Sequence, residues 1–462
     1  MSISSLLYVA RDALGVSQVG IDVTGSNIAN VNTSGYSRQR AVINSTGGDY
    51  VKGMVFQASV SVDRIQRLYD RYLEGQMITQ KQNIGYSSTL NDRLSSIESI
   101  MNEAQTGGLN DLLNKFWSAW ENLSANPTGP VERDSVAAMA ESVATKLNSF
   151  AGDLIRLKGD IKTSIRDIVT SVNSMTAEIR NLNERIAETG VKGGETNILS
   201  DKLVGLLGDL GESIGITWNE NNDGTVSVFL QNGVPLVERL VSYDLQAKDL
   251  SDRIVVSSVK VNPDEELNTV ISKGKLGALL ECQDEIIPQY QKLLNNFASS
   301  LADAVNKVHR QGFDINGNAG GDFFVYSSSN PSMTIRLNPD IASDLRLIAA
   351  SSTVNRDGEN AAQIAALKDA LIMENGSATL NSYYAAIIGR IGREVADSSK
   401  DLEHQNVVLT NVTSRRESVS GVSIDEEMIE LMKYQMSYAA AGRLISVTNE
   451  ILDILMNLGV NS

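Results

Sequence analysis

Cysteine and histidine are almost absent from this sequence, which has one cysteine, Cys282, and two histidines, His309 and His404. A single cysteine cannot form an internal disulfide, so we expect folding to be independent of an oxidising compartment. Neither histidine has a sequence neighbour at the spacing of a metal pair, and the zinc-protease, Cys-x-x-Cys, phosphate-loop and nucleophile-elbow patterns are all missing. We therefore predict that the protein is not an enzyme and that it has no catalytic residues, no cofactor and no metal site.

Aromatic residues and long apolar runs are also scarce. Aromatics make up 5% of the chain against 42% hydrophobic residues, so most of the apolar surface comes from Leu, Ile, Val, Ala and Met, which helices bury well. No stretch approaches the ~20 consecutive apolar residues of a membrane span, and residues 1–12 lack the basic leader of a Sec signal peptide. Because the formal net charge of −16 repels phosphate and anionic lipid, we expect neither nucleic acid nor a membrane as a partner.

The sequence does contain two long helical repeats of apolar residues, over 136–189 and over 380–419. In the first repeat the apolar positions recur in alternating steps of four and three, and two successive steps of four at Leu157, Ile161 and Ile165 form a stutter. Helices of this length have to pack lengthwise on partners, so the pattern predicts a long coiled-coil helical rod formed by both halves of the chain. Shorter helical stripes cover residues 65–101, 109–123 and 290–308.

Between the long repeats the apolar period changes from helical spacing to two. Asp223-Gly224 and Asn232-Gly233 separate alternating segments and are typical of hairpin turns. We therefore predict an α+β fold that is mainly α, with an antiparallel β-rich domain inserted between the helices. The expected domains are residues 1–40 with 421–462 for terminal helical assembly, 41–195 with 272–310 and 345–420 for the coiled coil, and 196–271 with 311–344 for the β-rich outer part.

The two ends of the chain carry weaker helical repeats, over residues 3–31 and 424–456. Small and polar residues occupy alternate seam positions, so each helix is marginal by itself and is suited to an interface between subunits. The residues that we expect at this assembly interface are Leu7, Leu14, Ile21, Asn27, Ile28, Asn30, Asn32, Gly35, Tyr36, Ile424, Met428, Leu431, Tyr434, Tyr438, Ile445 and Leu452.

Two segments resemble binding sites but have simpler explanations. Residues 314–318, Asp-Ile-Asn-Gly-Asn, look like the start of a calcium loop, yet the glycine at the sixth position and the glutamate at the twelfth are replaced by Ala319 and Val325. We interpret this segment as a turn. Residues 116–120 could form an aromatic stacking platform, but their helical spacing favours packing in a core.

Motifs at both ends of the chain and in its middle resemble a known family. Residues 25–36, Gly-Ser-Asn-Ile-Ala-Asn-Val-Asn-Thr-Ser-Gly-Tyr, resemble the N-terminal motif of the flagellar rod, hook and hook-associated proteins. The continuation Ser-Arg-Gln at 37–39 is similar to the family of the first hook-associated protein. Residues 420–428, with Tyr434 and Gln435, resemble the closing helix of that family, and 308–324 resemble its middle.

This resemblance implies a structural subunit of the hook–filament junction of the bacterial flagellum, secreted to the outside of the cell. It implies a tubular assembly in which paired terminal helices line the inner tube, and export of the unfolded chain by the flagellar type III apparatus. The implied partners are other copies of the chain in a helical ring, the hook protein below, the second junction protein (hook-associated protein 3) above and a dedicated export chaperone.

Other functions remain open from the sequence. The nearest alternative is another axial subunit, a hook or distal rod protein. An inserted hydrolase and a surface adhesin are further alternatives, although the β-rich segment offers no nucleophile and base, and no ligand signature. Larger relatives carry an additional outer domain after the Phe-Phe segment, and we expect this domain to be absent here, because Tyr326 leads within a short loop to residues 333–337.

Overall fold

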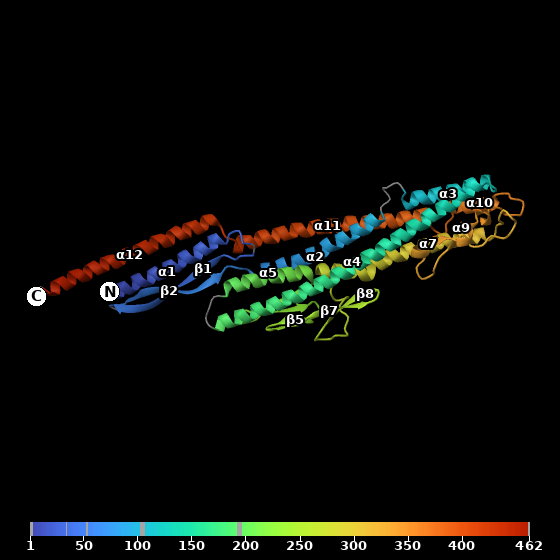
Figure 1. The fold of residues 1–462 in the computed structure, drawn as a ribbon. Coiled ribbons are helices and arrows are strands. Elements are labelled where there is room, and N and C mark those ends of the chain that lie inside the picture. The colour runs from blue at the N-terminus through green and yellow to red at the C-terminus, as the bar shows by residue number, and fades with distance from the viewer. Residues whose placement is uncertain (1–2, 34, 52–53, 102–106, 192–195, 461–462) are drawn as a thin grey trace. The chain divides into compact units, whose positions relative to one another are not determined.

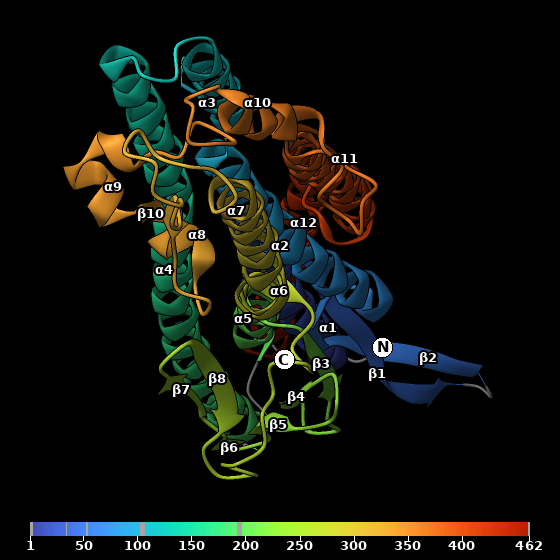
Figure 2. The ribbon, with the colours of Figure 1, turned by 90° about the vertical axis from the view of Figure 1, so that its right-hand side faces the viewer.

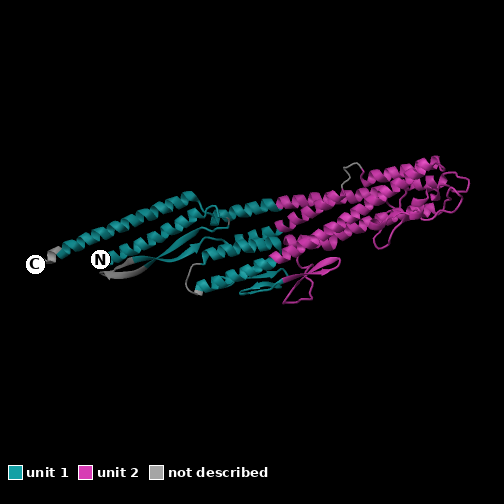
Figure 3. Ribbon diagram, viewed as in Figure 1, with its two compact units in different colours: residues 1–83, 172–244, 405–462 teal, residues 84–171, 245–404 magenta. Residues whose placement is uncertain are grey.

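The fold is known from a computed structural model, which describes residues 3–33, 35–51, 54–101, 107–191 and 196–460. The chain divides into two compact units. Unit 1 comprises residues 1–83, 172–244 and 405–462, and unit 2 comprises residues 84–171 and 245–404 (Figure 3). Three long helices, α2, α4 and α11, contribute residues to both units.

Helices dominate both units, as predicted (Figure 1). The long repeats at 136–189 and 380–419 form helices α4 and α11, and the terminal repeats form α1 and α12. Their bounds are α1 Ile3–Ala29, α2 Arg71–Ile100, α3 Leu109–Ala125, α4 Pro130–Val191, α5 Asn197–Ser213, α6 Gly274–Glu281, the π-helical turn η1 Cys282–Ile286, α7 Ile287–His309, α8 Pro331–Thr334, α9 Pro339–Ser343, η2 Leu345–Leu347, α10 Glu359–Ala365, η3 Ala366–Asp369, α11 Leu380–Ser420 and α12 Ile424–Val460.

The strands form antiparallel hairpins and one four-stranded sheet, ordered β3-β4-β5-β6, in the described residues. Asp223-Gly224 and Asn232-Gly233 connect β3 to β4 and β4 to β5, and both glycines have the positive φ that these turns need. The strands are β1 Gln39–Val51, β2 Met54–Arg67, β3 Ile216–Glu220, β4 Val226–Leu230, β5 Pro235–Glu238, β6 Val241–Ser242, β7 Leu245–Leu250, β8 Arg253–Ser258, β9 Phe324–Val325 and β10 Arg336–Leu337.

Hairpin β1–β2 lies in a range that the sequence assigned to helix. Val60 and Val62 alternate with Ser59 and Ser61, which is the period of a strand, and Ile65 pairs with Ala41 within the hairpin. Helix α5 likewise lies in the range assigned to the β-rich domain. The three-domain division therefore stays a prediction.

The buried face of α4 rotates further around the helix axis than the sequence indicated. Leu157, Ile161 and Ile165 are buried as expected, but the next buried residue is Val169, and Ile168 is only half-buried. The stutter thus has three successive steps of four, each of which rotates the apolar stripe by about 40° on a helix of 3.6 residues per turn. The rotation places Asn183 on the buried face, where it is fully enclosed.

Aromatic side chains form one core of unit 2. Phe116, Trp117 and Trp120 of α3 are buried. The Phe116 ring contacts Phe323 and Phe324, the Trp120 ring contacts Phe323, and the Trp117 ring contacts Phe116. Helix α10 packs against α3 and α7 at the same place (Figure 2). This confirms the expectation that residues 116–120 pack in a core.

Asn and Gln side chains on helices form hydrogen bonds with the backbone of strand residues in both units. In each case one buried Asn or Gln side chain accepts a hydrogen bond from the backbone N–H of a strand residue and donates one to the C=O of the same residue, at 2.7–3.3 Å. Such a side chain replaces a neighbouring strand and satisfies backbone groups that would otherwise be unpaired. The pairs are Asn27 with Gln39, Gln82 with Ile216, Asn183 with Val226, Gln283 with Ile254, and Asn306 with Phe324.

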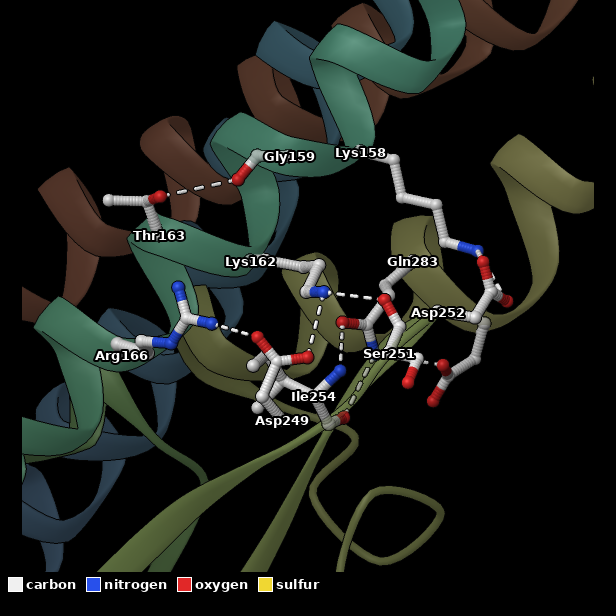
Figure 4. A network of polar contacts seen from close by, with 11 residues as sticks. Lys158, Gly159, Lys162, Thr163, Arg166, Asp249, Ser251, Asp252, Ile254 and Gln283 are labelled. Atoms are coloured by element: carbon white, nitrogen blue, oxygen red, sulfur yellow. Dashed lines mark hydrogen bonds and ion pairs between the residues drawn. The ribbon is translucent and has the colours of Figure 1, made fainter.

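Three basic residues of α4, Lys158, Lys162 and Arg166, form ion pairs with residues at the turn end of hairpin β7–β8 in unit 2 (Figure 4). The ammonium group of Lys158 lies 2.8 Å from the carboxylate of Asp252, and that of Lys162 lies 2.8 Å from the carboxylate of Asp249. Arg166 also pairs with Asp249, and the hydrogen bond from Lys162 lowers the pKa of this aspartate. Because the three bases are spaced by four, they share one helix face.

Candidate functional site: the paired terminal helices

Helices α1 and α12 pack side by side within unit 1, and hairpin β1–β2 also contacts α1 (Figure 1). Gly20 lies opposite Tyr434 and Asn27 lies opposite Glu427, so the two helices run antiparallel. The two ends of the sequence therefore form one structural element.

Small residues of α1 make its closest contact with α12. The buried side of this helix consists of Ala10, Val16, Ser17, Gly20, Val23, Thr24 and Asn27. Small side chains allow the helix backbones to approach, and the hydroxyls of Ser17 and Thr24 donate hydrogen bonds to the carbonyls of Ala13 and Gly20, so they need no other partner. The larger residues of the predicted seam, Leu7, Leu14, Ile21 and Ile28, remain half-buried.

Asn27 is the centre of a group of polar side chains that we call the terminal clasp: Asn27, Tyr36, Arg38, Gln39, Glu426 and Glu427. The Asn27 side chain is 1% exposed, and its oxygen accepts hydrogen bonds from the Tyr36 hydroxyl at 2.8 Å and the Gln39 N–H at 3.0 Å. Its nitrogen donates to the Gln39 carbonyl at 2.8 Å and to Glu427 at 2.9 Å. Every hydrogen-bonding position of this buried amide is thus occupied.

Arg38 connects the motif to the start of α12. Its guanidinium forms ion pairs at 2.6 Å with both Glu426 and Glu427, and its backbone N–H donates to the Ser420 carbonyl at the end of α11. Glu427 is 2% exposed, so its charge is buried and requires these partners. The acidic start of α12 therefore binds Arg38 in addition to interacting favourably with the helix dipole.

The turn before Arg38 is anchored directly on α11 and α5, and through Arg416 also on α2. Gly35, with a φ of +82°, turns its carbonyl to Arg416 of α11, which donates a hydrogen bond at 3.1 Å and forms a buried ion pair with Glu74 of α2 at 2.8 Å. The Ser37 N–H donates to Asp201 of α5 at 3.1 Å. The motif thus fixes the start of β1 against four helices, which explains why residues from both ends of the sequence are needed.

The side of α12 that faces away from α1 is exposed and carries many large apolar side chains, with the charged residues Asp425, Arg443 and Glu450 among them. We call it the outward α12 face; its large apolar residues are Ile424, Met428, Ile429, Met432, Met436, Val447, Ile451 and Ile454, each between 41% and 68% exposed. An extended apolar surface of this kind is typical of an interaction site and is uncommon on a monomer.

Apart from the half-buried α1 seam described above, the predicted interface residues fall into four groups in the structure. Asn27 and Tyr36 belong to the terminal clasp, and Asn30, Asn32 and Gly35 form the turn that follows α1. Leu431, Tyr434, Ile445 and Leu452 are half-buried on α12, whereas Ile424, Met428 and Tyr438 are exposed. Ser34 of the motif lies outside the described residues.

Sequence reasoning missed the charged partners of the motif. Glu427 and Asp201 bind residues 35–38 directly, and Glu74 binds Arg416, which in turn donates to the Gly35 carbonyl. All of these partners lie far from the motif in the sequence. One signal was available, because Arg416 occupies a seam position of α11 where the repeat requires an apolar residue. A charge in such a position indicates a buried ionic partner.

Two residues of types that often act in catalysis, His309 and Cys282, are enclosed in the core of unit 2. His309 is fully buried, donates from Nδ1 to the Gly321 carbonyl and accepts from the Ala349 N–H at Nε2, and burial lowers its pKa to about 4. Burial also raises the pKa of the Cys282 thiol to about 12. Both side chains are therefore uncharged at neutral pH.

The calcium-like segment is a turn, as interpreted from the sequence. Asp314 accepts hydrogen bonds from the backbone N–H groups of Asn316 and Asn318, and Gly317 has a φ of +84°. No group of three or more His, Cys, Asp or Glu residues suited to a metal occurs among the described residues. Among the helices that the structure describes, none combines the length and the apolar character needed to cross a bilayer.

Comparison with protein families gives three matches along the chain. Residues 94–324, half of the 462 residues, match the model of the flagellar hook-associated protein FlgK helical domain. Residues 7–36, which cover most of α1 and the turn after it, match the flagella basal body rod protein model. Residues 414–458, which cover most of α12, match the flagellar basal body rod FlgEFG protein C-terminal model. The two shorter matches coincide with the paired terminal helices.

Individual relatives agree with these matches. The chain is 28% identical to flagellar hook-associated protein 1 of Bacillus subtilis, with 98% of this chain and 97% of the relative covered. It is 24% identical to flagellar hook-associated protein 1 of Salmonella typhimurium, with 98% and 100% covered. In fold it is similar to the flagellar hook junction protein FlgK from Burkholderia pseudomallei, with a TM-score of 0.68 at 16% identity over 75% of this chain and 100% of that chain.

Proposed function

This chain belongs to the FlgK family of flagellar hook-associated proteins, and from this premise we propose that it is a structural subunit of the junction between the flagellar hook and the filament. In this role the protein is a mechanical adaptor without catalytic activity. Relatives that align with almost the whole chain carry the name of hook-associated protein 1, which supports this assignment over the other axial proteins.

The observation that carries the proposal is the pairing of α1 and α12 with the outward α12 face left exposed. A protein that worked as a monomer would bury such an apolar face or replace it with charged residues. Polymerisation of many copies removes the face from water along the full length of α12, and each large apolar side chain contributes about 1.5–3 kcal/mol when it is fully buried. The half-buried seam of Leu7, Leu14, Ile21 and Ile28 supplies a second apolar surface on the same helix pair.

The weak terminal helices also fit export as an unfolded chain through the flagellar type III apparatus. The single buried cysteine leaves no disulfide to oppose unfolding, and the contacts of α1 involve small side chains. Terminal helices of this kind gain most of their stability from neighbouring subunits, because binding to the folded state shifts the folding equilibrium. A dedicated chaperone would cover the apolar residues of α12 before export.

In the assembled flagellum we place the chain outside the cell, in a ring of copies of itself with the hook protein below and the second junction protein above. The alternative is another axial subunit, a hook or distal rod protein, which would use the same terminal helices. The helical-domain match at 94–324 favours the junction role.

Electron microscopy of a strain that lacks the gene separates the two assignments. The junction role predicts normal hooks without filaments, together with flagellin in the medium. Absence of hooks would assign the chain to the hook or rod instead, and normal filaments would contradict any axial role.

A further inference from the structure

Methionines are concentrated on the outward α12 face. Met428, Met432 and Met436 are 45%, 50% and 68% exposed, and their spacing of four residues aligns them along one side of the helix. Met456, near the end of the described part of α12, is 68% exposed. Elsewhere in the described chain Met101 and Met373 are 0% and 4% exposed, whereas Met333 is an isolated methionine that is 42% exposed.

The other side of α12 differs in chemistry. There Tyr434 packs on Gly20, and Ala441 and Thr448 are buried. Thus the sulfur atoms lie on the side that the helix pair leaves free. Before assembly a soluble oxidant can reach them, and after assembly the proposed neighbour covers them.

We propose that Met428, Met432 and Met436 are a redox-sensitive modification site, at which oxidation by peroxide blocks incorporation of the subunit. A sulfur lone pair attacks the peroxide and forms an S–O bond, the O–O bond breaks, and the other oxygen leaves as water. Each thioether loses two electrons and becomes a sulfoxide, while one molecule of hydrogen peroxide is reduced. This inference rests on the proposed role of the outward α12 face in assembly.

The physical consequence follows from the polarity of the product. A thioether is apolar and adapts its shape to an irregular partner surface, whereas a sulfoxide is a strong hydrogen-bond acceptor. Burial of a sulfoxide without a donor costs free energy at each site. Oxidation replaces the three apolar side chains of Met428, Met432 and Met436 with polar ones without a change in the helix backbone, and a sulfoxide reductase can reverse the change.

The test measures incorporation of purified full-length chain onto hooks isolated from a strain that lacks it. Untreated chain should bind, and chain treated with hydrogen peroxide should bind about tenfold less or weaker still. Circular dichroism should show the same helix content for both samples. Peptide mass spectrometry should find sulfoxide at Met428, Met432 and Met436 before it appears at Met101 and Met373.

A variant with Met428→Leu, Met432→Leu and Met436→Leu provides the matched control. Leucine has a similar volume and cannot be oxidised, so the variant should bind hooks as the parent chain does and should keep binding after peroxide treatment. Equal binding of oxidised and untreated parent chain would overturn the inference, and so would equal loss of binding by the leucine variant. If untreated parent chain fails to bind hooks, the proposed function itself is contradicted.

Discussion

The aromatic ring of Tyr434 lies directly against Gly20, so that a Cβ atom at position 20 would be 2.5 Å from the ring carbon Cδ1. No side chain fits in this space unless α1 and α12 separate or the ring moves. The glycine is therefore a contact point of the terminal helix pair, in a helix where glycine is otherwise unfavourable.

Gly20→Ala should destabilise α1 by about 2 kcal/mol, because overpacking forces the helices apart. Gly15 lies on the same helix with open space around its Cα atom, so Gly15→Ala should instead stabilise α1 by about 1 kcal/mol. Hydrogen exchange of the α1 backbone amides measures both effects. The same sign for both variants would contradict this account of the contact.

Asn27→Asp should disrupt the terminal clasp. The substitution removes both hydrogen bonds that the amide nitrogen donates and places a second carboxylate 2.9 Å from Glu427, at a cost on the order of 3 kcal/mol. Adding Glu427→Gln to the Asn27→Asp variant should restore part of the stability, since the new amide can donate to the introduced carboxylate. Denaturant unfolding of the single and double variants measures the coupling, and additive effects would show that the two residues do not interact.

Asn183→Ala should release strand β4 from α4. The variant leaves the N–H and C=O of Val226 without their buried partner, which costs on the order of 3 kcal/mol. Asn181 lies two positions away on the exposed side of the same helix, and Asn181→Ala should change stability by less than about 0.5 kcal/mol. Exchange of the Val226 amide should accelerate only in the first variant.

The buried His309 predicts a loss of stability in mild acid. Its pKa in the folded protein is about 4, below the ordinary value of 6.5, so the unfolded chain binds a proton that the folded chain excludes. The free energy of unfolding is therefore unaffected by His309 protonation above pH 6.5. It falls as the pH is lowered from 6.5 towards 4, by about 3 kcal/mol in total.

Unfolding of the parent chain and of His309→Gln at several pH values between 7 and 4.5 measures this contribution. The variant should be less stable at pH 7 and should show a weaker pH dependence. An identical dependence in the two proteins would contradict the assignment to His309.

The long helices could be predicted because local sequence determines them. The apolar steps of α4 and α11 continue over many turns and record the buried face directly. The hairpin turns at Gly224 and Gly233 were equally accessible, since a positive φ requires a particular residue type. By contrast, hairpin β1–β2 was missed, because short runs such as Val60 and Val62 are weak signals beside a helical stripe.

The contacts of the terminal clasp could not be predicted in the same way. An asparagine on a helix usually indicates an exposed position, and nothing local shows that Asn183 pairs with Val226 or that Asn27 pairs with Glu427, 400 residues away. Such pairs depend on tertiary structure. The resemblance at residues 25–39 identified the correct segment, but the structure was needed to identify its partners.

The most direct test of the account is to place charge on the outward α12 face. Ile429 and Met432 are 60% and 50% exposed, so Ile429→Glu with Met432→Glu should leave the monomer folded. We predict that a deletion strain carrying this variant secretes the chain and flagellin into the medium and shows bare hooks by electron microscopy. Normal filaments on these hooks would contradict the claim that this face assembles the junction.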